Sequence, residues 1–172
     1  MWEVTNTNAY RNELKFLVTD LEIEIIRKRL DGILKKDINV GSDDGYYISS
    51  MYFDTYHDRY YQESSDGVDN RSKWRIRQYN GSKEFILENK RKKRNLVAKS
   101  SSRITMEEYN ACCRWDRKGG LHTENELLKV FLTDKSRLKL EPKIVVNYYR
   151  IPWIYNLGDV RITLDCNIES SK

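Results

Sequence analysis

The chain has 172 residues, a hydrophobic fraction of 39% and an aromatic fraction of 12%, which favours one folded domain over a disordered chain. Residues 71–103 are rich in Lys and Arg and contain only Glu84 and Glu88 as acidic residues, so the basic charge is concentrated. No stretch approaches the ~20 apolar residues of a membrane span, and the N-terminus lacks the apolar region of a signal peptide. We therefore expect a cytoplasmic protein with no membrane segment.

The periodicity of apolar residues predicts an α+β domain dominated by an antiparallel sheet. A first strand is expected over residues 10–18, where Leu14, Phe16 and Val18 share one face. Thr19 and Asp20 are candidate N-caps for a helix over residues 21–36. Further strands are expected over 46–54, 71–80, 83–93, 95–105, 137–153 and 160–168, and helices or turns over 57–67, 105–115 and 123–134. The Asn-Gly pair at 80–81 predicts a hairpin between the third and fourth strands.

Charged side chains share one face on five of these strands. Alternation along residues 73–80 places Lys73, Arg75 and Arg77 on one face and apolar side chains on the other. Each charged face alone is typical of a solvated outer surface. Five together favour a sheet that curves round with its charged faces inward. The other four faces are Arg11/Glu13/Lys15, Glu88/Lys90/Lys92, Arg150, and Arg161/Asp165.

Such an interior is suited to a polyanion. Like charges confined at low dielectric repel one another, and a bound anion removes that cost. Arginine donates two parallel hydrogen bonds to phosphate oxygens and lysine adds a point charge. The sparse carboxylates are suited to Mg²⁺ or Mn²⁺ that bridges to phosphate.

Six segments occur in an order that resembles the vacuolar transporter chaperone (VTC) polyphosphate polymerase domains. They are RNELKFLV, SSMYFDT, RSKWRIRQY, FILENKRK, NYYR and VRITLD. That family has the triphosphate tunnel (CYTH-like) fold, an eight-stranded antiparallel β tunnel with flanking helices. The resemblance runs from about Tyr10 to Asp165 and implies one domain over residues 1–172. The family continues past the RITLD strand with a closing strand. The tunnel is therefore expected to be incomplete at the C-terminus, and its open edge favours a homodimer.

The resemblance also implies residue roles, and these are expectations. Phosphate-binding residues would be Lys15, Arg75, Arg77, Lys90, Lys99, Arg150 and Arg161. Catalytic residues would be Arg75, Arg77, Lys90, Arg150 and Arg161. Ligands of Mn²⁺ or Mg²⁺ would be Glu13, Glu88 and Asp165.

The implied reaction is transfer of the ATP γ-phosphoryl group to a growing polyphosphate chain. Position 11 is Arg where the hydrolytic and cyclase members have the first Glu of a Glu-x-Glu-x-Lys strand, which favours the polymerase branch. Triphosphate hydrolysis on the same fold and non-catalytic binding of polyphosphate or a nucleotide remain alternatives. The basic run NKRKKRN leaves nucleic-acid binding as a less favoured reading. Asn89 departs from the family, which usually has an apolar residue at this outward position.

Overall fold

The computed structural model of the protein describes residues 7–40, 44–114 and 123–172. The described elements, in chain order, are β1 (Thr7–Asn12), α1 (Asp20–Asp31), β2 (Lys35–Lys36), β3 (Tyr46–Asp54), α2 (Arg59–Ser65), β4 (Arg71–Tyr79), β5 (Phe85–Lys93), β6 (Leu96–Ile104), α3 (Met106–Cys113), α4 (Glu126–Leu138), β7 (Glu141–Tyr155) and β8 (Val160–Ser171), with a 3₁₀ turn at Asn156–Gly158. None of the described helices is both long and apolar enough to cross a membrane.

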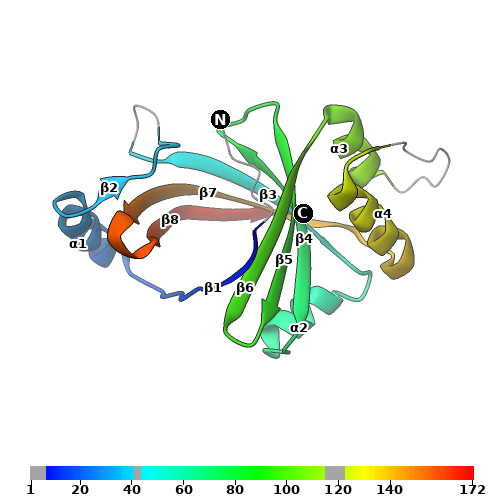
Figure 1. The fold of residues 1–172 in the computed structure, drawn as a ribbon, viewed down its shortest axis with the longest axis horizontal. Coiled ribbons are helices and arrows are strands. Elements are labelled where there is room, and N and C mark those ends of the chain that lie inside the picture. The colour runs from blue at the N-terminus through cyan, green and yellow to red at the C-terminus, as the bar shows by residue number, and fades with distance from the viewer. Residues whose placement is uncertain (1–6, 41–43, 115–122) are drawn as a thin grey trace.

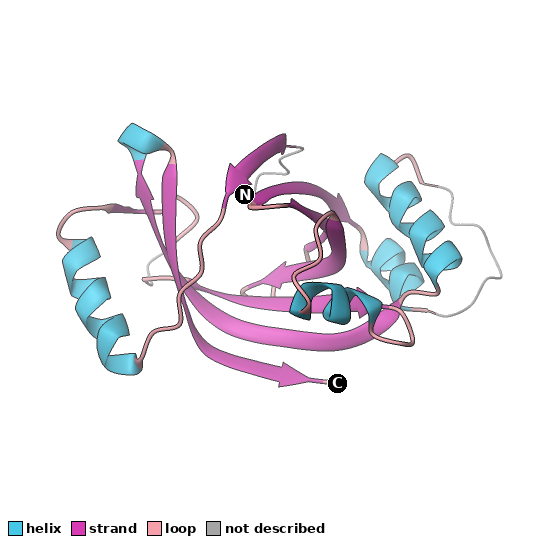
Figure 2. Cartoon of the chain, turned by 90° about the horizontal axis from the view of Figure 1, so that it is seen from below, coloured by secondary structure: helices cyan, strands magenta, loops and turns pink. Residues whose placement is uncertain are grey.

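The eight strands of the described residues belong to one curved antiparallel sheet (Figures 1 and 2). The strand order is β1-β6-β5-β4-β3-β7, and β8 pairs with β7. The short strand β2 also pairs with β7, beyond the point where β3 begins. No pairing joins the edge strands β1 and β8 within the described residues, so the sheet is not closed. The predicted antiparallel tunnel with an open side and flanking helices is therefore confirmed.

One face of β3–β6 packs against α2, α3 and α4 and forms the main hydrophobic core. Trp74 of β4 and Phe53 of β3 both contact the ring of Phe131 on α4, with centroid distances of 5.2 Å and 4.9 Å. Because side chains alternate across a strand, the residues next to Trp74 point to the opposite face of the sheet. This core therefore commits Lys73 and Arg75 to the concave face.

The concave face has an apolar cluster at one end. Tyr46 and Ile48 of β3, Tyr79 of β4, Ile86 of β5 and Tyr148 of β7 are buried there against one another. A third core lies elsewhere, where α1 packs on β7 and β8. The concave face is thus apolar at one end, and the charged rows of β4, β5 and β6 begin where this cluster stops.

Most element boundaries agree with the sequence predictions, and α1 shows both an agreement and a correction. Thr19 caps the helix as expected: its hydroxyl accepts from the Glu22 backbone N–H at 3.3 Å, and the Glu22 carboxylate accepts from the Thr19 N–H at 2.7 Å. The helix was expected to reach residue 36, but it ends at Asp31 because Gly32 follows. Residues 35–36 form β2 instead. Strand β7 begins at Glu141 rather than 137, since α4 continues to Leu138.

The predicted strand over residues 10–18 is wrong beyond Asn12. Among the described strands only β6 pairs with this segment; β6 begins at Leu96, and Leu96 is the residue that pairs with Asn12. Residues 13–18 thus have no strand beside them to complete a ladder, and they form no regular element. Leu14 and Phe16, expected on a shared face, are 80% and 78% exposed. Residue 115 of the predicted helix over 105–115 lies outside the described residues.

Candidate functional site

The strand register gathers the predicted phosphate-binding residues on the concave face. Arg75 of β4 lies opposite Glu88 of β5, and Lys73 lies opposite Lys90. The next register places Lys90 opposite Lys99 of β6. These side chains therefore form adjacent rows across three neighbouring strands.

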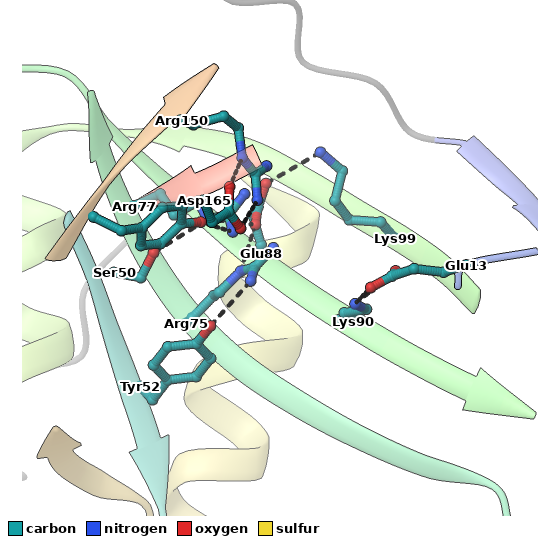
Figure 3. Close-up of polar contacts among 11 residues, drawn as sticks. Glu13, Ser50, Tyr52, Arg75, Arg77, Glu88, Lys90, Lys99, Arg150 and Asp165 are labelled. Atoms are coloured by element: carbon teal, nitrogen blue, oxygen red, sulfur yellow. Dashed lines mark hydrogen bonds and ion pairs between the residues drawn. The ribbon is translucent and has the colours of Figure 1, made fainter. Parts of the chain in front are cut away.

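Glu88 is the centre of the site (Figure 3). Its side chain is fully buried, and its carboxylate accepts a hydrogen bond from Arg75 Nε at 2.7 Å and from Lys99 Nζ at 3.1 Å. Arg77 Nε lies 3.6 Å from the same carboxylate. Three cations therefore surround one anion in a largely buried place.

The ionisation of this cluster follows from that arrangement. Burial on its own raises the pKa of Glu88, but the charges of Arg75, Arg77 and Lys99 lower it more strongly, so the net pKa lies well below its usual value. For Arg77 the directions are opposite: burial lowers its pKa, but the charge of Glu88 raises it above the ordinary arginine value. Both shifts favour the charged forms of Glu88 and Arg77, and the cluster of three basic residues and one carboxylate has an excess of positive charge.

Hydroxyl groups from β3 and β7 hold the two guanidinium groups in place. Arg75 Nη1 donates to the Tyr52 hydroxyl at 3.2 Å. Arg77 donates from Nε to Ser50 Oγ at 3.2 Å and from Nη2 to the Tyr148 hydroxyl at 2.9 Å. Sequence reasoning missed these three hydroxyl residues. The alternation of YYISSMYFD carried a usable signal, since it places Ser50 and Tyr52 on one face of β3.

Arg150 and Asp165 form a bidentate ion pair across β7 and β8. Arg150 Nε and Nη2 lie 2.6 Å and 2.7 Å from the two Asp165 oxygens. The Arg150 guanidinium also lies 5.2 Å from the centroid of the Tyr148 ring, whose hydroxyl accepts from Arg77. Burial lowers the pKa of Arg150, but its bond to Asp165 raises it overall. This pair thus joins the edge of the Glu88 cluster (Figure 3).

A second ion pair lies nearer the exposed end of the site. Lys90 Nζ lies 2.8 Å from both oxygens of Glu13, a residue of the segment that follows β1. Lys15 Nζ is 3.8 Å from Glu13, and the Lys15 side chain is 81% exposed. Burial raises the pKa of Glu13, yet its bond to Lys90 lowers it overall. Lys15 therefore lies at the margin of the site.

Arg161 does not join the Glu88 cluster. Its Nη2 lies 2.6 Å from the buried Asp37 carboxylate and donates to the Tyr46 hydroxyl at 2.8 Å. Tyr46 belongs to the apolar cluster at the end of the concave face. Of the seven predicted phosphate-binding residues, Arg161 is thus the one at the far end.

The three predicted metal ligands are each paired with cations. Glu13 contacts Lys90, Glu88 contacts Arg75, and Asp165 contacts Arg150. In the part of the chain that the structure describes, no three acidic, His or Cys side chains are grouped so as to hold a metal ion. The carboxylates present therefore do not fit a preassembled metal site.

Comparison with known proteins identifies the family. The sequence profile of the VTC domain matches residues 10–172. The chain belongs to the VTC domain family. None of the curated proteins matches it significantly.

Solved structures share the fold of this VTC domain. A Bacillus halodurans protein that bears an adenylate cyclase name aligns with a TM-score of 0.57 and 18% identity, over 91% of this chain and 70% of the other. The Hippeastrum protein HpAC1, named as an adenylyl cyclase and described as having a dominant triphosphatase activity, aligns with a TM-score of 0.53 and 12% identity, over 87% and 68% of the two chains. Identities this low show the fold of the VTC domain and not its chemistry.

Proposed function

We propose that this VTC domain binds the phosphate groups of ATP and polyphosphate on its concave face and transfers the γ-phosphoryl group of ATP to the end of a growing polyphosphate chain. The observation that carries the proposal is the buried cluster of Arg75, Arg77 and Lys99 around the single carboxylate of Glu88. Uncompensated cations in a buried place are costly unless an anion joins them. A chain of phosphate groups is an anion of the right shape for a row of such cations.

Arg75 retains donors for such a ligand. Its guanidinium has five N–H groups; one is used by Glu88 and one by Tyr52. The remaining donors suit the paired oxygens of a phosphate group. Because Glu88 and Tyr52 fix the guanidinium in advance, little ordering of Arg75 accompanies binding.

The proposed transfer forms one bond and breaks one bond. A terminal oxygen of the polyphosphate chain attacks the γ-phosphorus of ATP, and the bond to the β–γ bridging oxygen breaks, so that ADP leaves with the electron pair. Arg75, Arg77, Lys90 and Arg150 would hold the phosphate oxygens in line and stabilise the charge that spreads over them. Lys15 and Lys99 would contribute to binding, and Arg161 would act only at the far end.

In this proposal a divalent ion is bound by the substrate and not by the protein carboxylates that the sequence suggested. Since Glu13, Glu88 and Asp165 are separately paired with cations, we assign Mg²⁺ or Mn²⁺ to the substrate, as the ion that accompanies ATP. No step is assigned to an ion held by the protein.

The test is ATP turnover by the purified chain with Mn²⁺, with and without a short polyphosphate primer, resolving ADP, free phosphate and long chains on a gel. We expect ADP release to match chain lengthening, and we expect Arg75→Ala to abolish both. Arg29→Ala is the matched control, because Arg29 is an exposed arginine on α1. Arg75→Lys keeps the positive charge but lacks the paired donors of the planar guanidinium group, and should retain weak polyphosphate binding.

Other products would point to other functions. Free phosphate without chain lengthening would show a triphosphate hydrolase. Tight polyphosphate binding without turnover, lost in Arg75→Ala, would show a binding module. Binding that follows the base sequence of RNA and ignores polyphosphate would overturn the proposal altogether.

A further inference from the structure

Lys73 is a concave-face cation to which the family resemblance assigns no role. It precedes Arg75 by two residues on β4, and the register places it opposite Lys90, which itself lies opposite Lys99. Three lysines thus occupy one row across β4, β5 and β6. Like charges at directly opposed positions of a sheet are destabilising, so this row needs a counter-charge.

The neighbours of Lys73 in the row have carboxylate partners. Lys90 is paired with Glu13 at 2.8 Å and Lys99 with Glu88 at 3.1 Å. Lys73 has neither an ion pair nor a hydrogen bond to any residue that the structure describes. It is therefore the lysine of the row that has no direct carboxylate contact among the described residues.

The carboxylate nearest to Lys73 in the strand register is hydrogen-bonded to other residues. Asp54 lies one position beyond the Phe53–Trp74 pair, beside Lys73. Its two oxygens accept three backbone N–H groups, from Thr55 at 2.7 Å, Tyr60 at 2.8 Å and Tyr61 at 2.9 Å. These bonds hold the start of α2, so Asp54 makes no ion pair with Lys73 and acts on its charge only through space.

The surroundings of Lys73 disfavour its charge. The side chain is half-buried, and burial lowers the pKa of its ammonium group below the usual lysine value. The positive charges of Arg71 and Lys15 lower it further, and the opposing effects of Tyr52 and Asp54 do not cancel the net decrease. A bound anion would offset these effects by stabilising the charged form of the ammonium group.

We propose that Lys73 is a phosphate-binding residue that extends the site beyond Arg75 and gives it a preference for three or more linked phosphates over two. Two residues of a strand span about 7 Å. A single phosphoanhydride link is shorter than this distance, whereas two links approach it. When one phosphate is held at Arg75, the phosphate two links away, the third of the chain, therefore lies near Lys73.

Side-chain exposure gives the direction in which the ligand extends. Arg77 and Arg75 are 8% and 11% exposed, whereas Lys90 and Lys99 in the row of Lys73 are each 26% exposed. The phosphate chain thus enters past the lysine row and ends at the arginines. This inference rests on the proposed function, since it requires that the site binds linked phosphates.

The experiment measures the binding of pyrophosphate and tripolyphosphate by calorimetry to the wild-type chain, Lys73→Met and Lys83→Met. Methionine keeps the apolar stem of Lys73 and removes its charge. Lys83 is an exposed lysine in the hairpin before β5, so its variant matches the change in net charge. We expect Lys73→Met to weaken tripolyphosphate binding by about tenfold, as for a lost charged hydrogen bond, and pyrophosphate binding by less than about threefold. Lys73→Arg should restore most of the tripolyphosphate affinity.

A second readout separates binding from structure. Because Lys73 has no hydrogen-bond or ion-pair partner among the described residues, Lys73→Met should unfold at the same urea concentration as the wild type, or higher, without ligand. A lower midpoint would show a structural role and overturn the inference. An equal loss of affinity for pyrophosphate and tripolyphosphate in Lys73→Met, or affinities equal to those of Lys83→Met, would also overturn it. If the wild type binds tripolyphosphate and Arg75→Ala does not, the proposed function survives that result. If the wild type binds neither ligand, both proposals fail.

Discussion

Glu88→Gln tests whether the buried cluster is organised by one carboxylate. The substitution keeps the size of the side chain and removes the charge shared by Arg75, Arg77 and Lys99. Removing one partner of a buried ion pair costs about 3–5 kcal/mol, because the remaining charge stays buried. Arg75 and Lys99 keep 11% and 26% of their side-chain surface exposed, which favours the lower end, about 3 kcal/mol.

The assay is urea unfolding of the wild type, Glu88→Gln and Glu84→Gln over a range of pH. Glu84 is an exposed residue before β5, and its variant should stay within about 0.5 kcal/mol of the wild type. The folded pKa of Glu88 is lowered by its cations in spite of its burial. Its contribution is therefore present above its unfolded pKa, about 4.3, and is lost as the pH falls through the folded value.

The loss in free energy of unfolding caused by Glu88→Gln should accordingly be largest near neutral pH and become smaller in acid. Added tripolyphosphate should also reduce it, because the ligand supplies the missing negative charge. A deficit below about 1 kcal/mol at neutral pH, or one that does not shrink on acidification, would refute this account of the cluster.

Two further substitutions test features outside the cluster. Asn89 is buried on the helix-covered face, and its side-chain oxygen is unpaired among the described residues. Asn89→Leu should therefore raise the free energy of unfolding by about 1 kcal/mol. An unchanged or lower urea midpoint would contradict this expectation. A Cβ at Gly45 would lie 2.2 Å from the Arg150 carbonyl oxygen, so Gly45→Ala should lower the free energy of unfolding by about 2 kcal/mol or more and weaken tripolyphosphate binding through Arg150. The control is Gly158→Ala, whose added Cβ would have no atom closer than 3.5 Å and which should unfold like the wild type.

The sequence was sufficient to predict which side chains share a face, because alternation is a local property. The predicted strand over 46–54 coincides with β3, and the hairpin of β4 and β5 lies where the Asn-Gly pair indicated. The same rule failed for residues 13–18, which alternate as well as any strand. A strand also needs a neighbour to complete its hydrogen bonds, and β6 ends its pairing at Asn12.

Partner choice within the site was not predictable in the same way. Glu13, Glu88 and Asp165 were expected to share a metal ion, yet each is paired with a different set of cations. The pairing of Glu13 with Lys90 joins residues 77 positions apart in the chain. The pairings of Glu88 and Asp165 join neighbouring strands, but they depend on a register that alternation alone does not fix. The position of Arg161 beside Asp37 depends on contacts of the same long-range kind.

The order of the strands has a consequence for synthesis on the ribosome. Strands β3 to β6 are neighbours both in the chain and in the sheet, so they can assemble as soon as they emerge. The other edge of β3 pairs with β7, and α1 packs on β7 and β8. Until β7 is made, a nascent chain therefore carries an unpaired β3 edge and a helix whose apolar side has no surface to cover. This is the stage at which strand-to-strand aggregation is most favoured.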